Sequence, residues 1–184
     1  HDCSCPSSTK SNDGKRDPEM HQTRKGNQSF FGMKAHIGAY MESGLVYHVH
    51  CTAAKVANVT QVAELLHGDE NAVYAEAGYT VVEKRKEHEN RKVIWQIAGR
   101  RSTYTKLSKR SRIYKTKREI ERAKALTRAK VEHPFRVIKR QFGHVKNRFR
   151  GSVKNTAHLT TLFVLSNLWM VRKKLMGMGE LRLG

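Results

Sequence analysis

One carboxylate stands among many cations between residues 128 and 146. The basic residues around Glu132 are Arg128, Lys130, Arg136, Lys139, Arg140 and Lys146. At about 100° per residue on a helix, Arg128, Glu132 and Lys139 fall within about 40° of one another. A lone acid in such a field could bind a metal ion whose other partner is a phosphodiester. The alternative is a solvated helix face with one intrahelical ion pair, which contributes a few tenths of a kcal/mol.

The helix that carries Glu132 is predicted by an apolar stripe beside the charged residues. Its members recur at spacings of four, three and four, which suits one helix face packed on a core. They are Val131, Phe135, Ile138 and Phe142. We therefore predict a helix from about residue 117 to 142. Because Pro134 removes one backbone hydrogen bond, we also expect a kink or break near Glu132.

The charge of the chain indicates a polyanionic partner. Its 184 residues carry a formal net charge of +20, from 36 Lys and Arg against 16 Asp and Glu. Nucleic acid is the first candidate because neutralising phosphates releases counterions, and an acidic membrane surface is the second. The longest apolar stretch, residues 162–171, is interrupted by Ser166 and Asn167 and is too short to span a bilayer. We expect no membrane partner.

Cysteine usage argues against a zinc site or a disulfide framework. The chain has Cys3, Cys5 and Cys51, an odd count with no Cys-x-x-Cys spacing. A reducing, intracellular setting fits this pattern.

A second group of cations lies upstream of the helix. Residues 100–118 hold nine Lys or Arg and no acid, with Tyr104 and Tyr114 interleaved. This composition suits phosphate contacts with occasional stacking on bases or sugars. A solvated basic loop is an equally good interpretation.

The remaining elements are predicted from hydrophobic periodicity. Residues 1–28 are polar and are expected to be a loop or extended segment. Alternation over 31–39 and 45–51 predicts a β-hairpin with one buried face, and we expect Lys34 and His36 on its other face to be exposed to solvent. A short helix over 59–66 and an apolar, central strand over 72–75 follow, and the strand runs directly into Glu76.

Three further elements complete the predicted order. We expect an exposed charged helix over 82–92, a strand over 93–98 and a final helix over about 155–175 with Asn155 as its N-cap. The whole order predicts an α/β or α+β fold with one sheet.

Several motifs resemble those of one enzyme family. Arg128-x3-Glu132-x6-Lys139 is similar to an Arg-x3-Glu-x6-Lys signature around a last catalytic acid, and residues 75–79 are similar to an Ala-Asp-Ala-Gly-Tyr motif around a middle acid. Residues 17–28, 31–38 and 155–169 match further segments in order. Together they resemble the DDE transposases of bacterial insertion sequences, in the branch with an RNase H-like catalytic core.

The resemblance implies a fold and a chemistry. The fold would be α/β, an RNase H-like mixed sheet flanked by helices, with a partial core over 29–150, a basic insertion over 100–118, and a C-terminal helix and tail over 151–184. Glu76 and Glu132 would be catalytic acids that bind Mg²⁺ or Mn²⁺, since hard cations require anionic oxygen ligands. The residues implied in phosphate binding are Arg128, Lys139, Arg136, Arg140 and Lys34. The partner would be double-stranded DNA, both the ends of the insertion sequence and its target, and the transposase would form a homo-oligomer. The protein would lie in the bacterial cytoplasm, associated with the nucleoid.

Two departures from the family pattern bear on activity. The first acid of the family precedes a Pro-Ser-Ser-Thr-Lys segment that begins here at Pro6, so its position falls before His1, and Asp2 has the wrong register for that role. Glu76 stands where the family has Asp. We therefore expect an N-terminally truncated transposase that lacks its first strand and is inactive alone. The alternative is a non-catalytic basic DNA-binding protein that competes or co-assembles with an intact transposase.

Overall fold

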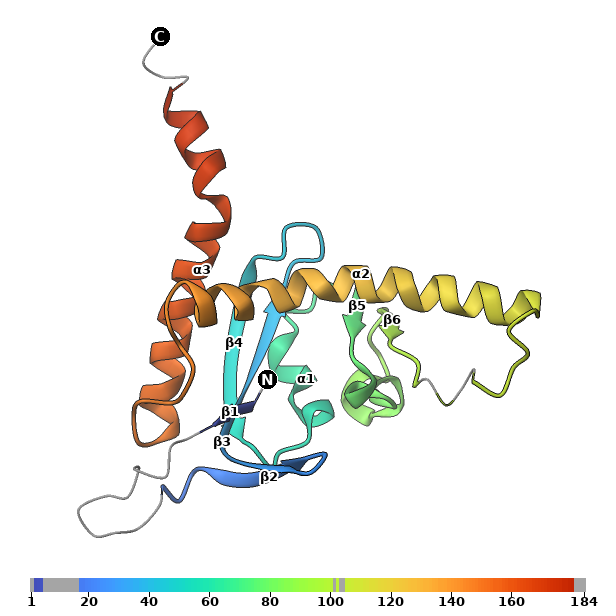
Figure 1. Cartoon of the computed structure of the whole chain (residues 1–184), viewed down its shortest axis with the longest axis horizontal. Helices are drawn as coiled ribbons and strands as arrows, with labels where there is room; N and C mark the ends of the chain where they lie inside the picture. The colour runs from blue at the N-terminus through green and yellow to red at the C-terminus, as the bar shows by residue number, and fades with distance from the viewer. Residues whose placement is uncertain (1, 5–16, 101, 103–104, 181–184) are drawn as a thin grey trace.

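Two sheets and two long helices form most of the fold (Figure 1). The computed structural model describes residues 2–4, 17–100, 102 and 105–180. The strands are β1 (Asp2–Ser4), β2 (His21–Lys25), β3 (Gln28–Ala39), β4 (Val46–Ala53), β5 (Ala72–Ala75) and β6 (Ile94–Ile97). The helices are α1 (Val62–Leu65), α2 (Arg112–Arg140) and α3 (Ser152–Glu180), with short 3-10 turns η1 (Asn58–Gln61), η2 (Ala77–Tyr79), η3 (Val82–Lys84) and η4 (Lys86–His88). The predicted α/β class is confirmed.

Strand β3 is the central strand of an antiparallel sheet. It pairs with β4 from Met33 to Ala39, with β2 from Gln28 to Gly32, and with β1 over Gly32, Met33 and Lys34. Because Gly32 pairs with both β1 and β2, and Met33 with both β1 and β4, β1 must lie on the edge opposite β2 and β4. Beyond Lys34, that second edge of β3 pairs with no strand in the described part of the chain.

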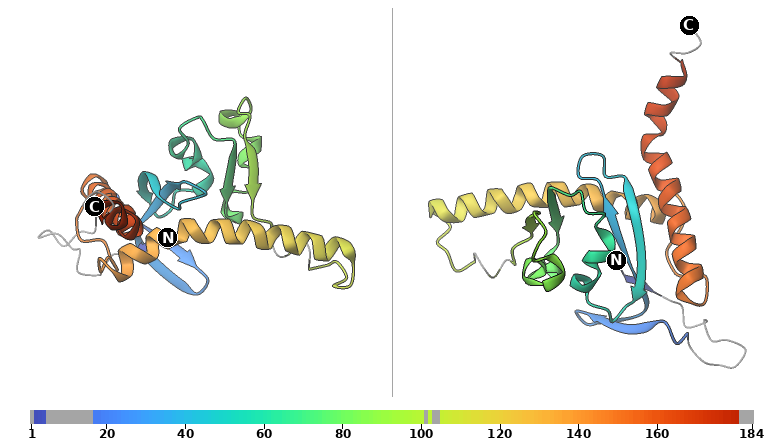
Figure 2. Two further views of the ribbon diagram at one scale, coloured as in Figure 1. Left: turned by 90° about the horizontal axis from the view of Figure 1, so that it is seen from above. Right: turned by 180° about the vertical axis from the view of Figure 1, so that it is seen from behind.

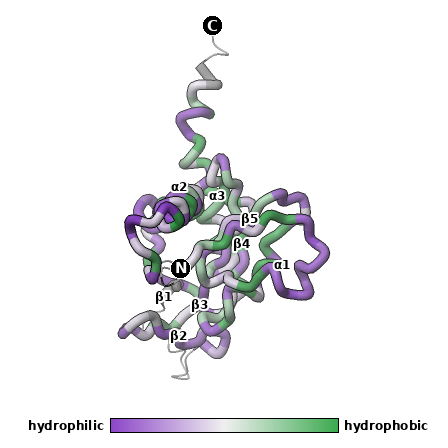
Figure 3. The backbone as a smooth tube through the Cα atoms, turned by 90° about the vertical axis from the view of Figure 1, so that its right-hand side faces the viewer, coloured by the Kyte–Doolittle hydropathy of each residue, from purple (hydrophilic) through white to green (hydrophobic). Residues whose placement is uncertain are grey.

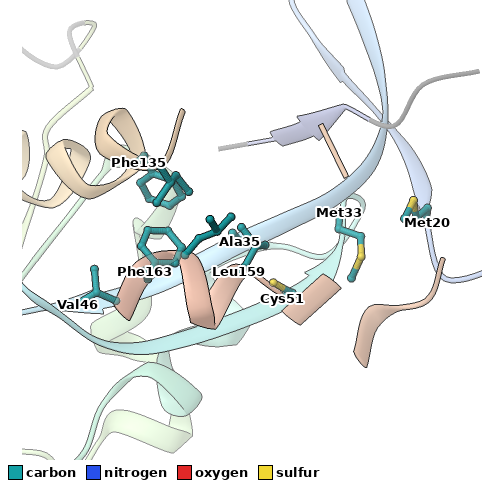
Figure 4. Packing of buried hydrophobic residues seen from close by; sticks show 10 residues of the cluster. Met20, Met33, Ala35, Val46, Cys51, Phe135, Leu159 and Phe163 are labelled. Carbon is teal, nitrogen blue, oxygen red and sulfur yellow. The ribbon is translucent and has the colours of Figure 1, made fainter. Parts of the chain in front are cut away.

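The predicted hairpin is confirmed, and its alternation builds the core. Met33 and Ala35 of β3 and Val46 and Cys51 of β4 are buried. Helices α2 and α3 cover them with Phe135 and Phe163, whose rings meet edge to face with centroids 5.2 Å apart. Figure 4 shows these side chains converging between the sheet and the two helices. This geometry suits aromatic pairs, whose ring edges are positive and faces negative.

Helix α3 is fastened to the sheet by an amide. The side chain of Asn167 accepts a hydrogen bond from Val46 N at 2.9 Å and donates one to Val46 O at 2.7 Å. The amide therefore satisfies both backbone groups of a residue that begins β4. Beyond this point α3 continues well clear of the rest of the molecule (Figures 1 and 2). No helix among the described residues is both long enough and apolar enough to cross a membrane.

The second sheet consists of β5 and β6, which run parallel. The predicted strands over 72–75 and 93–98 are thus confirmed, but the prediction of β5 as a central strand is wrong, since β6 is its one partner among the described strands. Its apolar residues are half-buried, and α2 packs against it. The antiparallel and parallel pairings among the described strands therefore fall in two separate sheets, so the expectation of a single sheet is wrong.

Helix α2 crosses the carboxyl ends of this parallel pair. Lys124 Nζ donates to Ile97 O at 3.0 Å, and Gly99 N donates to Glu121 Oε2 at 2.9 Å. The two side chains also form an ion pair at 3.3 Å. Figure 2, in its view from above, shows both strands ending at α2. The end of β5, and with it Glu76, is thereby brought to the middle of the helix.

The segment over 82–92 corrects a prediction. In place of a charged helix it forms the turns η3 and η4. Val81 has φ +71°, and Arg85 is extended, so the backbone cannot continue as a helix. Val82 and His88 are buried and anchor the turns. Tertiary burial has overridden the helical preference of the charged residues.

The two long helices also differ from their predicted limits. Helix α2 begins at Arg112, after an extended Ser111, and remains helical through Pro134 to Arg140, so the expected break is absent. Helix α3 begins at Ser152, so Asn155 is not its N-cap. Instead the Asn155 amide donates to Phe149 O and Gly151 O, both at 2.7 Å. It holds the loop that precedes the helix.

The polar segment over 17–28 is extended, as predicted, but is more than a connection. Its residues form β2, which pairs with β3 across a tight turn at Gly26. Asp17 Oδ2 accepts from Gly151 N at 2.6 Å, and Glu19 accepts from Ser152 N. Carboxylates at these free amides stabilise the N-terminus of α3.

Candidate functional site on helix α2

The predicted acid and most of its predicted cations share one surface of α2. A shallow, open depression of about 430 Å³ is lined by Ala129, Glu132, His133, Phe135, Arg136, Lys139 and Arg140. Phe135 and Ile138 hold this part of the helix against the core, as the apolar stripe predicts. Their neighbours on the helix, Glu132, Arg136 and Lys139, are exposed. The depression thus presents one carboxylate and three cations to solvent from a rigid element.

Glu132 is not neutralised by its neighbours. Among the described residues its carboxylate takes part in no ion pair and no side-chain hydrogen bond. The intrahelical pair that the sequence offered as an alternative is therefore not formed. An exposed, unpaired carboxylate retains all its lone pairs for an external cation.

Arg128 is placed differently from the other cations. It lies one turn before Glu132, is half-buried, and its Nε has no hydrogen-bond partner among the described groups. A guanidinium N–H without a partner is costly to bury, because the group loses its hydration. This Nε is enclosed and does not face solvent, and Arg128 does not line the depression.

Glu76 lies at the end of the parallel sheet and is not among the residues that line the depression. It follows β5 directly, with an extended backbone, and its carbonyl accepts from Tyr79 N at 2.9 Å. Its side chain is exposed. Burial, and then the nearby charge of Glu76, raises the pKa of Tyr79 to about 12. The phenol therefore stays protonated beside the carboxylate at neutral pH.

The structure does not bring every predicted residue to α2. Lys34 is half-buried on β3, and its Nζ donates to Val56 O at 3.1 Å, so it fastens the hairpin to the following turn. The expectation that His36 is exposed is wrong, because it is 4% exposed and its Nε2 lies 2.9 Å from Thr52 Oγ1. Burial, followed by the charges of His50 and Lys34, lowers the pKa of His36 to about 4. Helix α1 contacts both β3 and β4 and helps to cover this face of the sheet.

Sequence reasoning missed the residues that position the site. Lys124 and Glu121 join α2 to the end of β6, and Lys130 Nζ donates to Glu42 O in the β3–β4 turn at 3.4 Å. A signal existed for the first pair, since an acid and a base three residues apart face each other on a helix. No group of three or more His, Cys, Asp or Glu side chains suited to a metal ion occurs in the described ranges.

Cations also continue along α2 away from the depression. Arg112, Lys115, Lys117 and Arg118 are exposed on the half of the helix that extends beyond the sheets (Figure 1). Figure 3 looks toward this end of α2 and shows it largely hydrophilic. The part of the predicted basic stretch at 101, 103 and 104, including Tyr104, lies outside the described residues.

Comparison with known families agrees with this arrangement. A family model described as a transposase DDE domain matches residues 6–168, which is most of the chain. No solved structure matches it closely. The matched range contains every described strand except β1, the whole of α2 and the first half of α3. Its mixture of parallel and antiparallel strands with helices is compatible with an RNase H-like fold.

Proposed function

Because the chain belongs to the family of transposase DDE domains, we propose that Glu76 and Glu132 are two of the acids that serve its chemistry on DNA. The function of the family is to cut and join DNA, and DNA is the partner. One observation supports this assignment for Glu132. Its carboxylate lines a depression together with Arg136, Lys139 and Arg140 and forms an ion pair with none of them.

The residues present suit a divalent cation such as Mg²⁺ or Mn²⁺. Glu76 and Glu132 offer hard, anionic oxygens on exposed side chains, and Glu132 is unpaired. When bound, such an ion supplies Lewis-acid stabilisation of phosphodiester oxygens and lowers the pKa of an attacking hydroxyl. The side chain of Glu76 is one methylene longer than an aspartate, so its carboxylate would be held less rigidly as a metal ligand.

The cations bind the backbone of double-stranded DNA. Arg136, Lys139 and Arg140 hold phosphates beside Glu132, and the half-buried Arg128 adds positive charge from the preceding turn. These contacts position the strand and offset negative charge that develops on the phosphate during cutting. The exposed cations from Arg112 to Arg118 extend the contact along the duplex. Lys34 contributes from β3 once its bond to Val56 O is exchanged for a phosphate.

We propose further that two acids do not suffice for cutting. A pair of divalent ions in near-octahedral geometry requires more anionic ligands than Glu76 and Glu132 provide. The 184-residue chain alone would bind DNA at the bacterial nucleoid without cleaving it. Cutting would then require a further acid. The alternative is a non-catalytic basic DNA-binding protein that competes or co-assembles with an intact transposase.

The test is metal binding and DNA nicking by the purified chain. Mn²⁺ binding followed by water proton relaxation should fall at least about tenfold in Glu132→Gln. The matched control is Glu119→Gln, which removes an exposed acid from the same helix and should leave binding unchanged. Equal loss in both variants would remove the assignment of Glu132. Nicking of supercoiled plasmid by the wild-type chain, abolished by Glu132→Gln, would overturn the proposed inactivity.

A further inference from the structure

The loop between α2 and α3 is basic and exposed. It lies along the first turns of α3 (Figure 1). Its exposed cations, which form an ion pair with no described acid, are Lys146, Arg148 and Arg150. Asp17 and Glu19 reach the end of the loop, but their carboxylates accept from the first amides of α3. Because unpaired cations attract a polyanion, this surface suits phosphates.

An aromatic ring stands among these cations on a fixed backbone. Phe149 is 42% exposed. Its carbonyl accepts from Asn155 Nδ2 at 2.7 Å, and its N–H donates to Asn155 Oδ1 at 3.4 Å. Asn155 itself is buried. One buried amide thus holds both backbone groups of Phe149, so the ring is kept at the surface and little further freedom is lost when something binds to it.

Two histidines support the Phe149 ring from within. The rings of Phe149 and His158 meet edge to face with centroids 5.3 Å apart, and those of His158 and His144 are 5.4 Å apart. The row of three rings leads from the buried His144 to the exposed Phe149. Burial and then the charge of His158 lower the pKa of His144, and the charges of Arg148 and Lys139 act in the same direction. The cations of the loop therefore adjoin those of the depression.

An exposed ring beside unpaired cations matches the chemistry of an unpaired DNA strand. Every base has a π-face that stacks on an aromatic ring, while cations follow the phosphates. In a duplex the bases stack on one another and present only their edges in the grooves. We propose that the α2–α3 loop binds unpaired DNA, with Lys146, Arg148 and Arg150 on phosphates and one base on Phe149. The choice of DNA rests on the proposed function, but these residues lie outside the depression.

The position of the loop favours DNA over an acidic lipid surface. Since Arg148 and Lys139 both act on His144, the loop continues the basic surface of the depression. One DNA molecule can lie on both, with its duplex over the depression and an unpaired end over the loop. The two surfaces then bind different forms of the same partner.

Oligonucleotide binding in EDTA tests the loop. A fluorescent thymidine oligonucleotide of about 12 nucleotides is titrated with the purified chain and followed by anisotropy. Phe149→Ala should weaken its binding by at least about fivefold and change the binding of a blunt duplex by less than about twofold. Val145→Ala, at another exposed apolar residue of the loop, is the matched control and should bind both DNAs as the wild type does. Equal losses for both DNAs in Phe149→Ala, or no loss for the oligonucleotide, would overturn the proposal.

Phe149→Trp separates stacking from a structural role. Tryptophan keeps an aromatic ring, so this variant should bind the oligonucleotide at least as tightly as the wild type. Its added fluorescence, compared with a wild type that contains Trp95 and Trp169, should be quenched when a base stacks on the ring. Absence of quenching, or Phe149-dependent binding to phosphatidylglycerol vesicles in place of the oligonucleotide, would overturn the assignment to DNA.

The phosphate contacts of the loop are measured by salt. In Arg148→Gln the slope of log K against log salt for the oligonucleotide should become shallower by about 0.7, the value for one phosphate of a single strand. An unchanged slope would contradict a phosphate on Arg148. Because these titrations contain EDTA, their failure is separable from failure of the metal site at Glu132, which Mn²⁺ binding measures.

Discussion

The backbone of Gly44 lies against the carbonyl oxygen of Lys130, where an added side-chain carbon would come within 3.0 Å of that oxygen. In a regular helix the Lys130 carbonyl would accept from residue 134, but Pro134 has no N–H to donate. The β3–β4 turn therefore approaches α2 at the carbonyl that proline leaves free. This contact fixes the part of α2 that carries Glu132.

Gly44→Ala should accordingly destabilise the protein. Gly44 has φ +70°, so alanine meets both backbone strain and the Lys130 carbonyl. We expect a decrease of about 2 kcal/mol or more in the free energy of unfolding, measured by urea denaturation. Gly26→Ala is the control, because Gly26 has φ +61° but open space around it, and should cost about 1 kcal/mol. Equal decreases would show that strain alone matters and that the Lys130 carbonyl does not.

Lys124→Met should loosen the parallel sheet from α2. The change removes the hydrogen bond to Ile97 O and the ion pair with Glu121, both partly buried. We expect about 1 kcal/mol less stability and faster hydrogen exchange of the β5 and β6 amides. Lys117→Met, on the exposed part of the same helix, should change stability by less than about 0.5 kcal/mol. Unchanged exchange in Lys124→Met would mean that Glu121 alone holds the sheet.

The buried His36 should make stability depend on pH. Burial and the nearby charges of His50 and Lys34 lower its pKa from 6.5 to about 4. Between these values the unfolded chain binds a proton that the folded chain does not, so the free energy of unfolding falls as pH falls from about 6.5 to about 4. The expected contribution is roughly 2 to 3 kcal/mol over this range.

His36→Gln separates this contribution from that of other histidines. Glutamine can bond Thr52 but does not titrate, so urea denaturation across this range should show a flatter pH dependence than in the wild type. Burial also lowers the pKa of His88 and of His144. Both histidines should therefore make the protein less stable as pH falls, equally in the wild type and in His36→Gln. Parallel wild-type and variant curves would contradict a titrating, buried His36.

Sequence patterns correctly predicted the helices and strands that bury one face and expose the other. The alternation along β3 and β4 and the stripe of Phe135 and Ile138 on α2 gave the right structures, because one face of each packs on the core. The turns at Val82 and His88 were missed because their anchors are single buried residues within a charged sequence. No periodicity marks such an anchor.

The site was predictable in part for a similar reason. Glu132, Arg136 and Lys139 lie on one helix, so their spacing alone places them on one surface. The position of the parallel sheet against α2 depends on Lys124 and Glu121 reaching the end of β6, a contact between segments far apart in the chain. The burial of Lys34 and His36 was not predicted either, since it depends on α1 and on the turn that contains Val56, which lie over this face of the sheet.

The cations beside Glu132 should act as phosphate ligands, and salt dependence of DNA binding measures this directly. The slope of log K against log salt should become shallower by about 0.9 for each phosphate that the variant no longer neutralises, in Arg136→Ala, Lys139→Ala and Arg140→Ala. Arg85→Ala is the control, because Arg85 is paired with Glu87 at 2.9 Å and offers little net charge. Its slope should match the wild type.

Titrations by fluorescence anisotropy in EDTA keep metal out of this comparison, so a shallower slope reports the binding of phosphates alone. The informative pair is Lys139→Ala and Arg85→Ala. If the two variants had the same slope, the part of α2 near Glu132 would not lie on the DNA, and the exposed cations from Arg112 to Arg118 would remain to account for binding. A shallower slope in Lys139→Ala alone places the duplex over the depression, because each released counterion corresponds to a phosphate held at that residue.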